Sequence, residues 1–256
     1  MNNIERVFKN KKAFIPFITC ADPNLETTRE IIFELVKNGA DIIELGIPFS
    51  DPTAEGEVIQ SANTRALLNG VTTDEILDFI QEVKKNLSTV LVFMTYANVI
   101  FSYGAEKFIK RCSEIGIEGI IVPDLPYEEK NEFYPFCKKY EVNLISMIAP
   151  TSEDRISMIA KEAEGFLYIV SSMGVTGERT NITTDLEKII NIAKLNKDIP
   201  CAVGFGISTP SQVSKISEIA DGVIVGSAIV KIIEKHSINS AKYVGEFVKQ
   251  MKSEIK

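Results

Sequence analysis

Histidine and cysteine are scarce in this sequence of 256 residues. The only histidine is His236, and the four cysteines, Cys20, Cys112, Cys137 and Cys201, form no C-x-x-C pair. A histidine-based catalytic triad, a multi-histidine metal site and a zinc or disulfide framework are therefore not expected. We expect buried, reduced thiols and no metal site. Acid–base chemistry must then be carried by Glu, Asp, Tyr, Lys or Cys.

The chain also lacks a basic block and a long apolar run. Its net charge is −7, and the only basic cluster is the short segment 9–12. Nucleic acid is thus not expected as a partner, because binding to the phosphate backbone needs clustered Lys and Arg. The longest apolar stretch, 90–101, is interrupted by Thr95 and Asn98 and is too short to span a bilayer. Since the N-terminus has no apolar signal core, we expect a cytoplasmic protein without a membrane partner.

Short apolar segments rich in Ile and Val recur along the whole sequence. They lie at 13–20, 41–46, 90–96, 119–122, 142–148, 166–171, 201–204 and 221–226. Segments that are apolar on both faces are typical of parallel strands covered on both sides. The segments between them are amphipathic; in one, Ile31, Ile32, Leu35 and Val36 fall on one helical face.

Eight strand–helix units in this length favour a closed barrel over an open, doubly wound sheet. No linker or low-complexity segment separates them. The sequence therefore predicts an α/β protein: a single (β/α)8 TIM barrel domain over 1–256, with extra helices. In such barrels the chemistry lies at the C-terminal ends of the strands and in the loops that follow.

Glu44 lies inside the second predicted strand, and the acids Asp51 and Glu55 follow in a loop. Side chains alternate along a strand, so Glu44 faces the barrel mouth if Ile43 and Leu45 pack against helices. A carboxyl group there is partly desolvated, which raises its pKa toward neutrality. The sequence leaves open an alternative, in which Glu44 is buried and paired with a Lys or Arg.

Glycines mark the junctions after the last three predicted strands, at 171–179, 204–208 and 225–230. In β/α barrels the last two loops and a helix N-terminus often bind phosphate. The candidates are Gly206, Gly226 and Ser227, with Gly177 closing over the anion. Three other residues receive no role. Cys20 has no histidine to activate it, Lys231 is interpreted as solvated, and Tyr96 either lines the pocket or belongs to the core.

The chain closely resembles the α subunit of tryptophan synthase over essentially its whole length. The motifs that carry the resemblance are PFITCADP (16–23), ELGIPFSDPTAEG (44–56), YAN (96–98), VPDLP (122–126), SSMGVTG (171–177), GFGIS (204–208) and VGSAIVK (225–231). The resemblance implies retro-aldol cleavage of indole-3-glycerol phosphate to indole and glyceraldehyde 3-phosphate. It also implies that this subunit needs no metal or organic cofactor.

The resemblance further implies roles for individual residues. Glu44 matches the acid–base group that protonates the indole ring. Glu55 stands where the family has an aspartate that meets the indole N–H and stabilises the positive ring. The matched substrate-binding positions are Phe17, Tyr168, Thr176, Gly177, Phe205, Gly206, Gly226 and Ser227.

A β subunit that carries pyridoxal phosphate is the partner that the resemblance implies, in an α2β2 complex. Asp51, Asn98 and Pro126 match positions at that contact, and Asp51 also suits a capping or turn role. Three alternatives remain open: a stand-alone lyase that releases indole, an activator of the β subunit with little activity because of Glu55, and a barrel that isomerises or epimerises sugar phosphates.

Overall fold

The structure, a computed structural model, describes residues 2–171, 182–204 and 206–255. Eight parallel strands follow one another in chain order and close into a barrel. They are β1 (Ala13–Thr19), β2 (Ile42–Gly46), β3 (Val90–Met94), β4 (Gly119–Ile121), β5 (Asn143–Ile148), β6 (Leu167–Val170), β7 (Cys201–Gly204) and β8 (Gly222–Val225). The predicted TIM barrel is confirmed.

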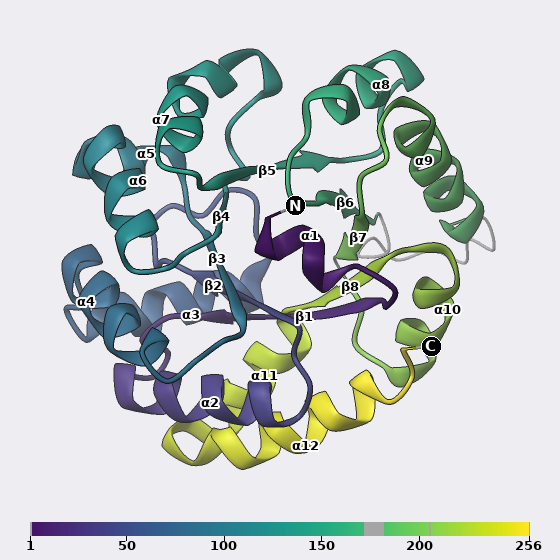
Figure 1. The fold of residues 1–256 in the computed structure, drawn as a ribbon. Helices are drawn as coiled ribbons and strands as arrows, with labels where there is room; N and C mark the ends of the chain where they lie inside the picture. Colours follow the sequence, from purple (N-terminus) through teal and green to yellow (C-terminus); the bar gives the residue numbers. More distant parts are fainter. Residues whose placement is uncertain (1, 172–181, 205, 256) are drawn as a thin grey trace.

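Most of the helices surround the barrel as an outer layer, and α1 (Asn3–Val7) lies across one end of it (Figure 1). The helices after α1 are α2 (Leu25–Lys37), α3 (Glu57–Leu68), α4 (Thr73–Lys84), α5 (Ala97–Tyr103), α6 (Ala105–Glu114), α7 (Tyr134–Lys139), α8 (Glu153–Glu162), α9 (Ile182–Asn196), α10 (Pro210–Ile219), α11 (Ser227–His236) and α12 (Ser240–Lys252), with the 3₁₀ turns η1 (Tyr127–Glu132) and η2 (Ser237–Asn239). Pairs of helices follow β2, β3 and β8, which confirms the expected extra helices. In the described part of the chain, no helix is both long and apolar enough to cross a membrane.

Local sequence signals explain where several helices begin. Thr72 caps α4 and Thr209 caps α10, each in a reciprocal pair with the residue three positions later. Such capping boxes satisfy two N–H groups that the first helical turn leaves unpaired. Pro210, at the first position of α10, loses nothing there, because that position needs no hydrogen-bonded N–H.

The short helix α1 lies across the end of the barrel where the strands begin (Figure 1). Its Ile4 is fully buried in the inner cluster of the barrel and lies within reach of Gly119 and Gly165. This packing fills the N-terminal end of the barrel. The open mouth is therefore at the opposite end, where the strands finish and the connecting loops meet.

The alternation along β2 divides its side chains between two apolar clusters. Ile43 and Leu45 belong to the cluster between the sheet and the helices, whereas Ile42 belongs to the inner cluster. Glu44 shares the inner face with Ile42, as predicted. The predicted strands all exist, but most are one or two residues too long. Tyr96, for example, is not in β3 but caps the N-terminus of α5.

Candidate active site

Glu44 lies on the inner face of the barrel wall, with Phe17 of β1 and Val92 of β3 as its register partners. Only 1% of its surface is exposed. Its Oε2 atom has no hydrogen-bond partner among the described residues, so the pairing with a Lys or Arg is not seen there. Burial raises the pKa of Glu44 to about 8, and the nearby charge of Glu55 adds to the effect. Glu44 therefore holds a proton at neutral pH, in a position to donate it.

Glu55 lies in the loop between β2 and α3 and lines the same cavity as Glu44. Burial raises the pKa of Glu55, a hydrogen bond from Tyr96 opposes this, and the charge of Asp124 adds to it. The hydroxyl of Tyr96 donates this bond to Glu55 Oε2 and favours the ionised carboxylate. No such donor to Glu44 Oε2 is seen among the described residues, so the hydrogen bond from Tyr96 favours the charged form at Glu55 over the charged form at Glu44.

Tyr96 makes three contacts with the loop between β2 and α3, which carries Asp51 and Glu55. Its hydroxyl donates to Glu55 and accepts a hydrogen bond from the Ala54 backbone N–H at 2.9 Å. Its ring stacks on Phe49, with 5.0 Å between the ring centroids. This role of Tyr96 was not predicted, because a contact between residues 41 positions apart depends on how β2 and β3 lie in the sheet. The sequence offers one indication of this contact. Tyr96 closely follows β3, which pairs with β2, and Glu55 lies in the loop that follows β2.

We expect Tyr96→Phe to lower kcat by about tenfold, because a hydrogen bond to a charged group is lost and Glu55 is held less firmly. The ring stacking on Phe49 remains in this variant, so the fold is retained. Tyr103→Phe is the matched control: its hydroxyl donates to Asp74 at 2.5 Å on the surface, away from the cavity. Steady-state turnover of the substrate that the resemblance implies measures both variants. Equal rates for Tyr96→Phe and wild type would show that Tyr96 does not position Glu55.

The cavity at the barrel mouth has a volume of about 50 Å3. It is lined by Phe17, Glu44, Glu55, Gly56, Ile59, Met94, Tyr168, Gly206, Ile207, Ile224, Gly226 and Ser227. The structure thus brings seven of the predicted catalytic and substrate-binding residues into one cavity. The other three, Thr176, Gly177 and Phe205, lie outside the described residues. The lining is mostly apolar, and electrostatic effects are stronger in apolar surroundings than in water.

The predicted phosphate end lies where α11 begins. Gly226 is the N-cap of α11 and Ser227 its first residue, and no side-chain hydrogen bond caps this end. The N–H groups of a first helical turn and the helix dipole attract an anion. On the other side, Gly206 has a φ of +72°, a conformation that residues with a Cβ rarely adopt. These two junctions can therefore offer backbone N–H groups to an anion, and no lysine is among the described residues that line the cavity.

Gly204 explains how Tyr168 fits beside Glu44. A Cβ atom at Gly204 would lie 2.4 Å from the Tyr168 hydroxyl oxygen, so only glycine leaves room for the tyrosine ring. Tyr168 is buried, and burial together with the charges of Glu44 and Glu55 raises its pKa well above the ordinary range. The Tyr168 hydroxyl is therefore uncharged at neutral pH, and the side chain forms part of the cavity lining.

The remaining sequence candidates lie apart from this cavity. Asp51, Asn98 and Pro126 are exposed, in the loop after β2, the first turn of α5 and the segment before η1. Cys20 is buried, and burial raises the pKa of its thiol to about 12, so it stays a thiol. Lys231 is exposed on α11. Within the described ranges, no three His, Cys, Asp or Glu side chains gather as metal ligands.

Comparisons with known proteins agree with this geometry. The family model for the tryptophan synthase alpha chain matches residues 5–256. A tryptophan synthase alpha chain from Lacticaseibacillus casei is 46% identical over 252 residues, which cover 98% of this chain and 95% of that protein.

Two solved structures have nearly the same fold. The tryptophan synthase subunit alpha from Legionella pneumophila str. Paris superposes with a TM-score of 0.90 at 36% identity, covering 100% of this chain and 98% of that one. A chain of the tryptophan synthase complex from Pyrococcus furiosus superposes with a TM-score of 0.85 at 33% identity, covering 95% and 99%.

Proposed function

Because this chain belongs to the tryptophan synthase alpha chain family, it is a lyase of tryptophan biosynthesis, and we propose that Glu44 and Glu55 carry its reaction. The reaction cleaves indole-3-glycerol phosphate to indole and glyceraldehyde 3-phosphate. This subunit needs no cofactor, since pyridoxal phosphate belongs to the β subunit. The observation that carries the proposal is that two carboxyl groups line one cavity, with a hydrogen bond from Tyr96 to Glu55 and no described hydrogen-bond partner for Oε2 of Glu44.

In the proposed mechanism, Glu44 donates its proton to the ring carbon that bears the glycerol phosphate chain. Protonation leaves the ring positively charged, with the charge shared by the ring nitrogen. The carboxylate of Glu55 accepts a hydrogen bond from the ring N–H and stabilises this charge. The carbon–carbon bond to the side chain then breaks, and its electron pair restores the aromatic indole. The neighbouring hydroxyl passes its proton to the carboxylate that Glu44 has become, which restores the acid, and the carbon that bears this hydroxyl becomes the aldehyde of glyceraldehyde 3-phosphate.

The substrate phosphate is proposed to bind at Gly206, Gly226 and Ser227 through backbone N–H groups. We expect Ser227→Asp to raise KM at least tenfold, because a carboxylate would stand against the anion. Ser253→Asp, which adds the same charge at an exposed position after α12, serves as the control. Steady-state kinetics over a range of substrate concentrations measures both variants. An unchanged KM for Ser227→Asp would place the phosphate elsewhere.

A β subunit that carries pyridoxal phosphate is the proposed partner, in an α2β2 complex in the cytoplasm. Asp51, Asn98 and Pro126 are exposed and therefore accessible to such a partner. A solved neighbour is a chain of a tryptophan synthase complex, which supports this proposal. The interface would bring the loop that holds Glu55 near the partner, because Asp51 lies in the same loop.

Indole formation from indole-3-glycerol phosphate, measured with and without the β subunit, tests this function. We expect slow formation of indole and glyceraldehyde 3-phosphate in equal amounts by the chain alone, and a higher kcat with β. Full activity of the chain alone would instead identify a stand-alone lyase. Stimulation of β without any cleavage would identify an activator.

A further inference from the structure

Helix α3 lies over part of the barrel mouth. Its Ile59 lines the active-site cavity, and its Ala62 is fully buried in the inner cluster of the barrel. Gly56, the N-cap of α3, lines the same cavity and directly follows Glu55 in the chain. The position of α3 therefore helps to determine where the main chain places Glu55.

Two side chains of α3 also hold the loop that carries Glu55. Gln60 Nε2 donates a hydrogen bond to the backbone carbonyl of Glu55 at 2.8 Å. Asn63, which is only 5% exposed, accepts a hydrogen bond from the Phe49 N–H at 3.1 Å. We call residues 49–55 the acid loop. Because both of its ends are bonded to α3, a displacement of α3 moves Glu55 as well.

The C-terminal part of α3 is held by Arg65. Its Nε and Nη2 atoms donate to the two carboxylate oxygens of Asp22, each at 2.8 Å. Its Nη1 atom donates to Glu234 at 2.9 Å. Asp22 lies in the loop between β1 and α2, and Glu234 belongs to α11, which lies beside α3 (Figure 1). One side chain thus joins α3 to two other elements around the barrel mouth.

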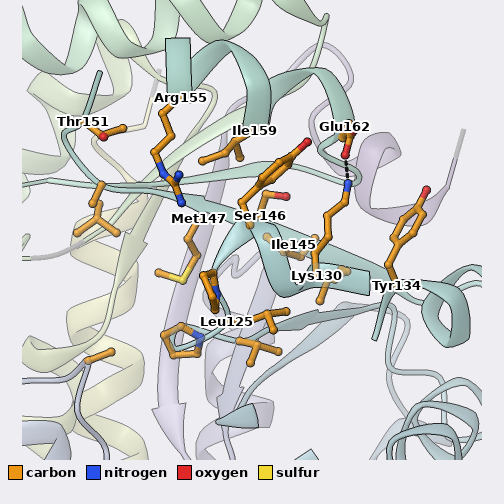
Figure 2. A pocket seen from close by; sticks show the side chains of 18 of the residues that line it. Leu125, Lys130, Tyr134, Ile145, Ser146, Met147, Thr151, Arg155, Ile159 and Glu162 are labelled. Atoms are coloured by element: carbon orange, nitrogen blue, oxygen red, sulfur yellow. Dashed lines mark hydrogen bonds and ion pairs between the residues drawn. The ribbon is translucent and has the colours of Figure 1, made fainter. Parts of the chain in front are cut away.

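The burial of Asp22 distinguishes this contact from the surface ion pairs. The Asp22 side chain is 1% exposed, whereas the carboxylate in the pair of Lys130 and Glu162, drawn as a dashed line in Figure 2, is 50% exposed. An exposed pair contributes little, but loss of the Arg65 guanidinium would leave a buried carboxylate unpaired. The two parallel bonds also fix the plane of the guanidinium, which a lysine cannot reproduce. Loss of Arg65 is therefore expected to displace α3.

We propose that Arg65 is a positioning residue of the active site: it holds α3 on the loop after β1, and α3 in turn holds the acid loop, with Glu55 at the cavity. This inference rests on the proposed role of Glu55. It implies that Arg65 affects turnover more than substrate binding. The phosphate is proposed to bind at Gly206 and at the start of α11, and Glu234 lies near the opposite end of α11.

Steady-state kinetics of Arg65→Gln tests the proposal. We expect kcat to fall about tenfold or more, with KM within about threefold of wild type, because a small displacement of Glu55 removes it from the geometry of the reaction. Arg65→Lys keeps the charge but not both bonds, so its kcat should lie between the two.

Arg111→Gln is the matched control. Arg111 joins α6 to α4 through a bond to Asp78 at 2.7 Å, and its side chain is 24% exposed, compared with 28% for Arg65. Neither helix carries a residue that lines the active-site cavity in the described part of the chain. We expect Arg111→Gln to keep the wild-type kcat.

Titration of the Glu44 carboxyl group separates positioning from a general loss of stability. Infrared difference spectroscopy follows this group, and its absence in Glu44→Gln assigns it. The charge of Glu55 contributes to the raised pKa of Glu44, and Tyr168 beside them stays uncharged. When Glu55 moves away, the pKa of Glu44 falls, so the midpoint in Arg65→Gln should lie at a lower pH than in wild type. A loss of stability alone would lower the melting temperature and leave this midpoint unchanged.

An unchanged Glu44 midpoint or a wild-type kcat in Arg65→Gln would overturn the proposal, as would an equal loss of kcat in Arg111→Gln. If thermal unfolding shows that Arg65→Gln does not fold, Arg65→Lys decides by the same two measurements, and wild-type values of both would overturn the proposal. The carboxyl titration needs no turnover. Absence of cleavage by the wild type would therefore contradict the proposed function, while the midpoints would still test Arg65.

Discussion

Replacing Glu44 with glutamine is expected to reduce kcat by about 10²–10⁴-fold, because the amide cannot donate the proton that the reaction needs. Glutamine has nearly the same shape, and the Glu44 carboxyl group is neutral at pH 7 in the native cavity. The fold and the binding of substrate should therefore survive. The measurement is kcat for indole formation, with phosphate binding followed separately.

The stability of this variant provides an internal control. The pKa of Glu44 is raised from 4.5 to about 8, so the native state holds a proton that the unfolded chain releases between these values. The contribution of the Glu44 proton to the free energy of unfolding is thus fully present below pH 4.5 and is lost as pH rises through about 8. Glu44→Gln lacks this loss, so its free energy of unfolding should equal or exceed that of wild type at pH 9. Activity within tenfold of wild type would remove Glu44 from the mechanism.

Replacing Glu55 with alanine is expected to cost about 2–4 kcal/mol of transition-state stabilisation, or roughly 30- to 1000-fold in kcat. The positive ring would lose its counter-charge in a cavity with a mostly apolar lining. Glu57→Ala is the control, since Glu57 is exposed at the start of α3, two residues further along the chain. We expect it to keep wild-type activity.

Glu55→Asp separates two accounts of the longer side chain. The Tyr96 hydroxyl donates to the Glu55 carboxylate, and the Ala54 N–H binds the same hydroxyl at 2.9 Å. With the loop backbone held there, an aspartate is one methylene too short to keep the contact, so activity should fall below wild type but stay above that of alanine. The rates should be measured in complex with β. If alanine matched wild type, the loop acid would not be catalytic, and the activator hypothesis would gain support.

Much of the fold follows from the sequence because alternation is a local property. Ile42, Ile43, Glu44 and Leu45 take the two faces of β2 as the pattern predicts, with Glu44 inside. Strand ends were predicted less well. The apolar pattern at the end of β3 continues through Tyr96, but α5 begins at Ala97, so backbone geometry and not hydrophobicity ends the strand.

Two features of the site could not be predicted from the sequence. The contact between Tyr96 and Glu55 depends on the register of β2 and β3 and on how the loop folds back, which no pattern within either segment encodes. The fit of Tyr168 against Gly204 depends on the pairing of β6 with β7, which no pattern within either segment encodes. By contrast, the glycine junctions at Gly206 and Gly226 were predictable, because helix starts and turns have local signals.

The pH dependence of kcat/KM in wild type and Glu44→Asp tests most directly whether Glu44 supplies the proton. The ratio kcat/KM reports the ionisation of the free enzyme. Since the acid must be protonated and the pKa of Glu44 is about 8, kcat/KM for wild type should fall as pH rises through about 8. In Glu44→Asp the midpoint should move, because a different carboxyl group titrates in a changed position. A fall at the same pH in both proteins, or no fall in wild type up to pH 9, would contradict the assignment of the proton to Glu44.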